Sequence, residues 1–251
     1  MKKTLLLFAA AFAFGAARAQ VSVIPKVGLT LARQHFDQTP NTIFGKEYYK
    51  TNCGLTAGVG FNVPLSKEKS LFFLQPELLY VQKGQRFEYA NEFYKAKGKD
   101  VMNYLEVPVL AQVKFGTEQI KCFVAAGPSL AYALGGRYAF DGVTLGGIAG
   151  GTSTHLEGRT VFRKAPENNI SNNQYMDPAY FNRLDVGVQA GGGIGLAVGP
   201  GMLQLEARYG HSLTSFYKGN TDNNSTADDQ ANFWNRTLAF TLGYAIPLGG
   251  K

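Results

Sequence analysis

Charged side chains are scarce in this sequence: Asp, Glu, Lys and Arg make up 17% of its 251 residues, against roughly 25% in soluble globular proteins. Apolar runs after the N-terminus are short, and none reaches the roughly 18 residues that a membrane-spanning helix needs. Aromatic residues, at 13%, are too many for a disordered chain, which combines few aromatics with much charge. The composition therefore excludes a helical membrane protein and an intrinsically disordered one. Glycine, by contrast, is abundant, with 30 residues.

The first 19 residues, MKKTLLLFAAAFAFGAARA, have the features of a secretory signal peptide. Lys2 and Lys3 precede an apolar stretch too short to span a membrane, and small residues stand at the cleavage position before Gln20. We expect residues 1–19 to be removed and 20–251 to form a single domain. Removal takes away three positive charges and lowers the formal net charge from +7 to +4. This modest charge says little about nucleic acid, and because the chain is expected to be exported we expect no nucleic-acid partner.

The dominant pattern is alternation of bulky apolar residues with small or polar ones, which is the period of a β-strand. From Leu184 to Val198 the bulky residues share one parity, and residues 238–248 repeat the pattern. Eight strands are predicted, at about 22–34, 53–64, 70–82, 102–116, 119–134, 184–198, 202–214 and 238–248. Pro76, Pro108 and Pro128 sit inside predicted strands. Each removes a ladder donor and predicts a local bulge or an early strand end.

The lengths of the connections indicate how these strands are arranged. Connections of three or four residues alternate strictly with long ones, at about 35–52, 83–101, 135–182 and 215–235. This order is typical of an up-and-down transmembrane barrel with short periplasmic turns and long extracellular loops. We therefore expect an all-β fold, an eight-stranded antiparallel β-barrel in the bacterial outer membrane. The alternative, a soluble periplasmic barrel around a ligand cavity, would place its apolar residues inside.

Outward aromatic residues should form a belt at each membrane interface. Tyr80, Tyr132 and Tyr209 fall near the predicted outer ends of their strands. Four others fall near the predicted inner ends: Phe61, Phe72, Phe115 and Tyr244. Between the belts, Val188 and Leu242 are expected near the middle of the membrane.

Several short motifs resemble those of the PorT-like outer-membrane β-barrel family of Bacteroidota. They are residues 74–80 (LQPELLY), 104–109 (YLEVPV), 126–128, 185–193 and 208–210. The resemblance covers nearly the whole chain after the leader and implies a barrel whose strands tolerate proline. The family includes a component associated with type IX secretion. The resemblance therefore implies a non-enzymatic, structural or protein-interaction role, with outer-membrane lipid around the barrel and another envelope or secretion protein as partner.

Candidate chemical sites have simpler structural explanations. The glycine run at 191–195 is not followed by the helix that a phosphate-binding loop needs. His211 and Ser212 are adjacent, so a strand points them to opposite faces and prevents a base–nucleophile pair without a bulge. Residues 222–228 alternate like a calcium loop but lack its central Gly and closing Glu. The sequence thus predicts no enzyme, metal or cofactor, and the open alternatives are a small-solute pore and a lipid-modifying outer-membrane enzyme.

Three charged residues of the predicted interior face are expected to form a network. Glu77 and Glu106 flank 83–101 almost symmetrically, so their carboxylates should be neighbours, and two confined carboxylates need a cation. Arg208 lies at similar predicted depth on the far wall, and its forked guanidinium can bridge two carboxylates. We expect the three to form a structural plug rather than a selectivity site.

The two cysteines are expected to stay apart. Cys53 follows a long outer connection, whereas Cys122 follows a short inner one. A disulfide needs Cα atoms within about 7 Å, and the apolar band alone is about 25 Å tall. Two free thiols are therefore predicted.

Overall fold

The computed structural model describes residues 21–36, 48–66, 71–144, 152–160, 182–216 and 233–248. The expected leader, residues 1–19, lies outside them. No helix in the described part of the chain is long and apolar enough to cross a membrane. Nine antiparallel β-strands are formed by the described residues: β1 (Val21–Phe36), β2 (Tyr49–Pro64), β3 (Phe72–Ala90), β4 (Tyr94–Gly116), β5 (Ile120–Thr144), β6 (Ser153–Thr160), β7 (Leu184–Val198), β8 (Gly201–Ser212) and β9 (Phe233–Leu248).

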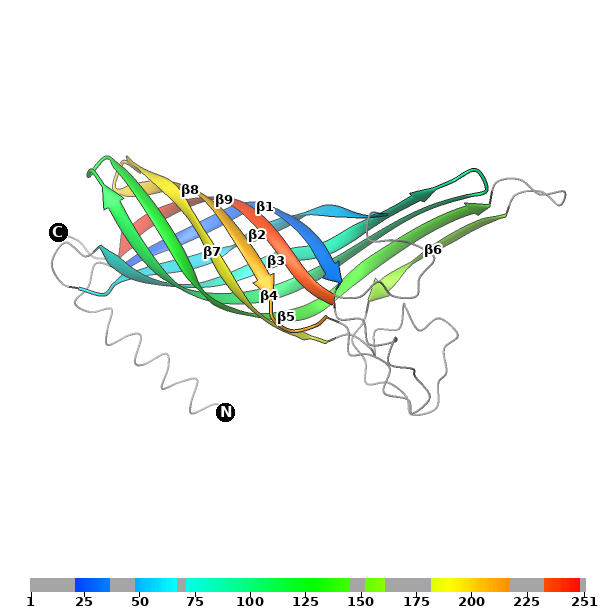
Figure 1. Ribbon diagram of the computed structural model, residues 1–251. Helices are drawn as coiled ribbons and strands as arrows, with labels where there is room; N and C mark the ends of the chain where they lie inside the picture. Colours follow the sequence, from blue (N-terminus) through cyan, green and yellow to red (C-terminus); the bar gives the residue numbers. More distant parts are fainter. Residues whose placement is uncertain are drawn as a thin grey trace.

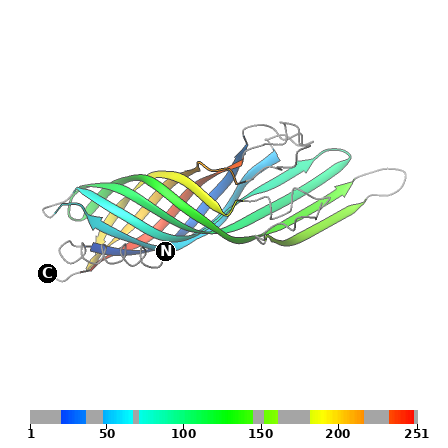
Figure 2. The same cartoon turned by 90° about the horizontal axis from the view of Figure 1, so that it is seen from below.

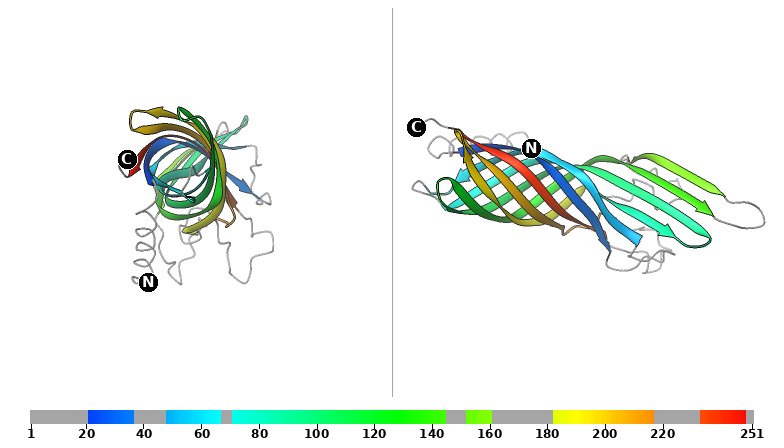
Figure 3. Two further views of the ribbon diagram at one scale, coloured as in Figure 1. Left: turned by 90° about the vertical axis from the view of Figure 1, so that its left-hand side faces the viewer. Right: turned by 90° about the horizontal axis from the view of Figure 1, so that it is seen from above.

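Eight of these strands close into a ring (Figure 1). Neighbours pair in the order β4-β3-β2-β1-β9-β8-β7-β5, and β4 pairs again with β5. The end-on view shows the closed ring directly (Figure 3, left). A closed ring leaves no unpaired strand edge in the bilayer, where water cannot satisfy backbone groups. The predicted eight-stranded up-and-down barrel is confirmed, and β6 is a ninth strand outside the ring.

The register of the ring sets the tilt of its strands. Following paired residues once around the ring from Phe115 on β4 leads to Leu105 on the same strand, ten residues away. The residues passed on the way are Cys122, Ile194, Leu205, Leu242, Val27, Ala57 and Tyr80. This stagger, at about 3.3 Å per residue and about 4.8 Å between strands, tilts the strands by about 40°. The ten residues then span about 25 Å along the axis, the height of an outer-membrane apolar band.

The outside of the ring is apolar and the inside is polar. On β7, Leu184 is 50% exposed and Ile194 49%, whereas Asp185 and Gln189 between them are buried. The residues buried inside the other strands include Lys26, Thr30, Asn62, Gln75, Glu77, Gln112, Gln204 and Glu206. A soluble barrel around an apolar cavity would show the reverse arrangement. The lipid-facing assignment of the apolar parity therefore holds.

Aromatic side chains lie near both ends of the apolar surface. Tyr80 pairs in register with Leu105, which pairs with Tyr132, and all three are exposed at the outer end of the band. Phe72 and Phe115 are exposed at the opposite end. Two interfaces about 25 Å apart are thereby marked, as an outer-membrane barrel requires.

The depth expected for Val188 is wrong. Val188 lies two residues outward of Ala190, which is the register partner of the belt residue Tyr209. Val188 is therefore near the outer interface. Leu242 lies halfway along the register path between Phe115 and Leu105 and does sit near mid-membrane. The error arises because the tilt makes residues with similar strand positions differ in depth.

The prolines do not interrupt their strands. Pro76, Pro108 and Pro128 lie inside β3, β4 and β5, and the register is the same on both sides of each. The predicted bulge or early strand end is wrong, because a proline removes one donor while its neighbours keep the ladder. The register shifts that do occur lie between Thr51 and Thr56 and between Asn103 and Tyr104.

The largest departure from the predicted loops lies beyond the barrel mouth. Residues 83–101 are not a loop: β3 and β4 continue to a tight turn that Asn91 closes by accepting from the backbone nitrogens of Phe93 and Tyr94. Within the expected loop 135–182, β5 continues to Thr144 and pairs with β6, while 145–151 and 161–181 lie outside the described residues. Strands β3 to β6 thus project from the barrel as a sheet (Figures 1 and 2).

Both cysteines are free, as predicted. Cys53 pairs in register with Leu31 toward the outer end of β1, whereas Cys122 pairs with Phe115 at the inner end of β4. The expected separation of the two thiols by most of the barrel height is confirmed.

The depth of Leu242 and Val188 leads to a stability prediction. Leu242→Arg should lower the free energy of unfolding by about 2–4 kcal/mol, because it places a charge at the membrane midplane. Val188→Arg should lower it by only about 0–1 kcal/mol, because that charge lies at the interface. Both side chains are 45% exposed on the lipid face, so they form a matched pair. The measurement is urea unfolding in lipid vesicles, and equal losses would contradict the register-derived depths.

Candidate functional site

Four charged side chains form a closed cluster inside the barrel: Lys26 on β1, Glu77 on β3, and Glu206 and Arg208 on β8. Arg208 donates to Glu77 through both terminal nitrogens, with Nη1–Oε2 at 2.6 Å and Nη2–Oε1 at 3.1 Å. Its Nε donates to Glu206 Oε1 at 3.0 Å. Lys26 Nζ donates to Glu77 Oε1 at 2.6 Å and to Glu206 Oε2 at 2.8 Å. Two cations thus balance two carboxylates, with exposures of only 3–7%.

Glycines on the neighbouring strands β7 and β2 lie directly beside this cluster. Gly191 is the register partner of Arg208, and a Cβ there would meet the Ala207 carbonyl oxygen at 2.3 Å. Gly60 pairs with Glu77, and a Cβ there would lie 3.3 Å from the Glu77 side chain. The run at 191–195 pairs continuously with β8, so it is strand and not a phosphate-binding loop. Gly191, Gly193 and Gly195 have the inward parity and add no side chain to the narrow interior.

Lys83 holds a second cluster closer to the outer mouth. Its Nζ lies 3.3 Å from Asp185 Oδ2 and 3.6 Å from Glu106 Oε1. Asn235 Nδ2 donates to Asp185 Oδ2 at 3.1 Å. The Lys83 ammonium also lies 4.9 Å from the centroid of the buried Tyr104 ring. Charged, polar and aromatic groups therefore all contribute to holding this lysine inside the barrel.

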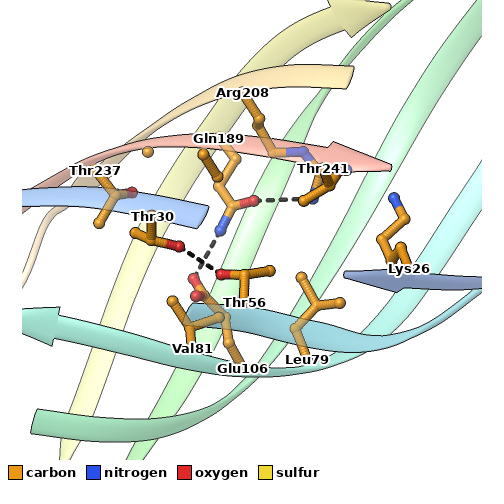
Figure 4. Close-up of a pocket in the computed structure, with 12 residues that line it drawn as sticks. Lys26, Thr30, Thr56, Leu79, Val81, Glu106, Gln189, Arg208, Thr237 and Thr241 are labelled. Carbon is orange, nitrogen blue, oxygen red and sulfur yellow. Dashed lines mark hydrogen bonds between the residues drawn. The ribbon is translucent and has the colours of Figure 1, made fainter. Parts of the chain in front are cut away.

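Gln189 connects the two clusters (Figure 4). Its Oε1 accepts from Arg208 Nη1 at 3.2 Å, and its Nε2 donates to Glu106 Oε1 at 2.6 Å. A glutamine can do both because its amide carries an acceptor and two donors. Arg208 and Glu106 are consequently coupled through one intervening side chain.

The predicted trio is therefore arranged differently from the expectation. Arg208 does bind Glu77, but among the described residues it forms no ion pair with Glu106. The register gives the reason: Glu106 pairs with Leu79 and not with Glu77, so the two carboxylates are staggered by two residues. Inward parity could have identified the members that were missed, which are Lys26, Lys83, Asp185, Gln189 and Glu206. Their partners could not be assigned without the register.

Little empty space remains between the clusters. A cavity of about 30 Å³ lies among Lys26, Thr30, Thr56, Glu106, Gln189 and Arg208 (Figure 4). At roughly 10–15 Å³ for each water, it accommodates about two water molecules. Within the described ranges, no group of three or more His, Cys, Asp or Glu residues is arranged to hold a metal ion.

The other candidate residues do not assemble into a site. β8 is regular through His211 and Ser212, so these adjacent side chains alternate between its faces. His35 lies beside the Trp234 ring, with centroids 6.3 Å apart. His155 on β6 hydrogen-bonds Asp141, and this bond raises the pKa of His155. The calcium-like segment 222–228 lies outside the described residues.

Removing Arg208 should destabilise the barrel. In the Arg208→Ala variant, Lys26 alone must balance two buried carboxylates. The free energy of unfolding should therefore fall by about 3–5 kcal/mol. Arg208→Lys should recover only part, because an ammonium cannot make the bidentate contact. The double variant Arg208→Ala/Glu206→Gln should be more stable than Arg208→Ala, since it restores the charge balance. Urea unfolding in detergent measures all three, and a wild-type midpoint for Arg208→Ala would show that the network has no energetic role.

The filled interior also leads to a transport prediction. Purified protein in planar lipid bilayers should show no steady conductance, because eight strands leave an interior that side chains fill and the ion-paired residues lie across it. Reproducible channels of porin size would contradict this and favour the pore alternative.

Comparison with solved structures finds other outer-membrane proteins at low identity. The chain is similar to Ail, the attachment invasion locus protein of Yersinia pestis, with 13% identity over 91% of this chain and 99% of that one and a TM-score of 0.37. It is similar to OprG from Pseudomonas aeruginosa, with 9% identity over 94% of this chain and 99% of that one and a TM-score of 0.42. We draw no functional conclusion from similarities at this level. No curated protein matches the chain.

A family profile described as "Outer membrane protein beta-barrel domain" matches residues 14–218. The matched segment spans most of the chain and includes strands β1 to β8. The ring closure, the apolar exterior and the polar interior described above agree with it. The chain therefore belongs to the outer membrane protein beta-barrel domain family, and the protein resides in the bacterial outer membrane.

Proposed function

We propose that this barrel is non-enzymatic and serves as a structural or protein-interaction component of the outer membrane. The observation that supports a contact role is the sheet beyond the barrel mouth, formed by residues 84–90, 94–101, 135–144 and 153–160 and called the extracellular sheet below. Strands β3, β4 and β5 have 19, 23 and 25 residues, whereas β7 and β8 have 15 and 12. The added length is not needed to cross the membrane, so it supports a task outside it.

The filled barrel interior also supports a contact role rather than transport. Two linked charge clusters lie across the interior, and the cavity beside Lys26 and Arg208 measures only about 30 Å³. Buried ion pairs are held by several partners at once, an arrangement that favours a fixed plug over a moving gate. A contact surface outside the barrel is then a simpler basis for function than transport.

The outer edge of β6 offers a specific mode of contact. In the described part of the chain, β6 pairs only with β5 and ends the strand order of the sheet. An edge strand presents backbone donors and acceptors to which an extended partner segment can add. The motif resemblance to PorT-like barrels favours an envelope or secretion protein as that partner, and a role accessory to type IX-like secretion.

Site-specific photo-crosslinking in intact outer membranes tests the proposal. A crosslinkable residue in place of Leu156, which is 42% exposed on the face of β6 opposite to that of Glu157, should yield a discrete protein adduct. The same residue in place of the lipid-facing Leu242 is the matched control and should yield none. Adducts absent from both positions, or equal at both, would argue against a protein partner at the extracellular sheet.

A further inference from the structure

One face of the extracellular sheet is strongly basic. On the face that continues the lipid-facing surface of β3, β4 and β5, only three acidic residues are present: Glu88, Asp141 and Glu157. The cations on the same face, counting Lys50 of the adjoining β2, are Lys50, Arg86, Lys95, Lys97, Lys99, Arg137 and Arg159. All seven are exposed. Seven cations against three carboxylates leave this face with a net charge of +4, taking histidine as neutral.

The five cations nearest the barrel occupy directly opposed positions on neighbouring strands. Lys50 pairs in register with Arg86, and Arg86 pairs with Lys99. Arg137 pairs with Arg159 on the neighbouring strands. Like charges in directly opposed positions of a sheet repel each other and destabilise it. The sheet therefore carries two rows of directly opposed like charges.

The acidic residues of the sheet relieve little of this repulsion. Lys50 pairs with Glu88, which lies one row farther from the barrel. Asp141 is hydrogen-bonded to His155. Within the described ranges, no carboxylate lies within 4.0 Å of a charged nitrogen of Arg86, Lys99, Arg137 or Arg159. An anion from outside the chain would satisfy what the chain itself leaves unpaired.

The position of the basic rows indicates which anion is within reach. Arg137 lies five residues beyond the belt residue Tyr132, and Arg86 lies six beyond Tyr80. At about 3.3 Å per residue and a tilt of about 40°, these cations stand about 10–15 Å above the belt. Their long side chains can extend back toward the headgroup layer. Because they point the same way as the lipid-facing residues below them, lipid headgroups are the anions they face.

We propose that this basic face binds the phosphate groups of anionic glycolipids in the outer leaflet. Opposed arginines suit this ligand, because each guanidinium fork can donate two hydrogen bonds to phosphate oxygens. A phosphate between Arg137 and Arg159 replaces their repulsion with two attractions. The bound lipid holds the basic face of the sheet toward the membrane and leaves the β6 edge accessible to a partner.

Binding of lipid A to the full-length protein in detergent tests this inference. The probe is lipid A with two phosphates, and the reference is the same lipid without phosphates. Arg137→Gln/Arg159→Gln should weaken binding of the phosphorylated probe by about 30-fold, since each basic residue near an anionic surface contributes about fivefold. The matched control Lys95→Gln/Lys97→Gln removes the same charge farther from the barrel and should weaken binding by less than about fivefold. Equal losses in both variants, or equal affinity for both lipids, would overturn the proposal.

Thermal unfolding separates loss of binding from loss of fold. Without lipid, Arg137→Gln/Arg159→Gln should have at least the wild-type Tm, because it removes opposed like charges. The phosphorylated probe should raise the Tm of the wild type and not that of the variant. If that variant misfolds, Arg86→Gln/Lys99→Gln gives the same comparison in the second row. Preference for a soluble polyanion such as heparin over lipid A, through the same arginines, would assign the face to a soluble partner and overturn the lipid assignment.

Discussion

A bilayer cannot hydrogen-bond to a strand edge, and the pairing of β4 with β5 meets this constraint by closing the ring. The remaining features follow from that closure. A stagger of ten residues over eight strands sets the tilt, and the tilt sets the height of the apolar band between Phe115 and Leu105. Eight strands also leave a narrow interior. The charged side chains of the two clusters find their partners across this narrow lumen.

The interior meets this demand with ion pairs whose partners lie far apart in the sequence. Lys26 and Glu77 are 51 residues apart, and Glu77 and Arg208 are 131 apart. Such contacts form only when the ring is complete, so the charge network and ring closure depend on each other. Because the desolvation of these charges is costly, the network is better evidence for a specific interior geometry than for high stability.

The extracellular sheet shows how one strand pattern serves two environments. Along β4, the parity that meets lipid at Leu105 carries lysines at positions 95, 97 and 99 beyond the membrane. No change of register on the β3–β4 ladder accompanies the transition. The alternation of the strand therefore continues while the solvent changes from hydrocarbon to headgroups and water. This continuity makes the basic face a direct extension of the lipid-facing surface.

The amino-acid sequence by itself determined the strand period, the lipid-facing parity and the alternation of short and long connections, since each is a local pattern. On β7, the contrast between Ile194 and Gly193 suffices to assign the two faces. Residues 83–101 have the composition of a polar loop because they carry charged side chains on strands exposed to water. Only the tertiary structure decided that Glu106 opposes Leu79, that Gln189 and Lys83 hold Glu106, and that Val188 lies at the interface. Register and tilt are properties of the closed ring, so no single strand encodes them.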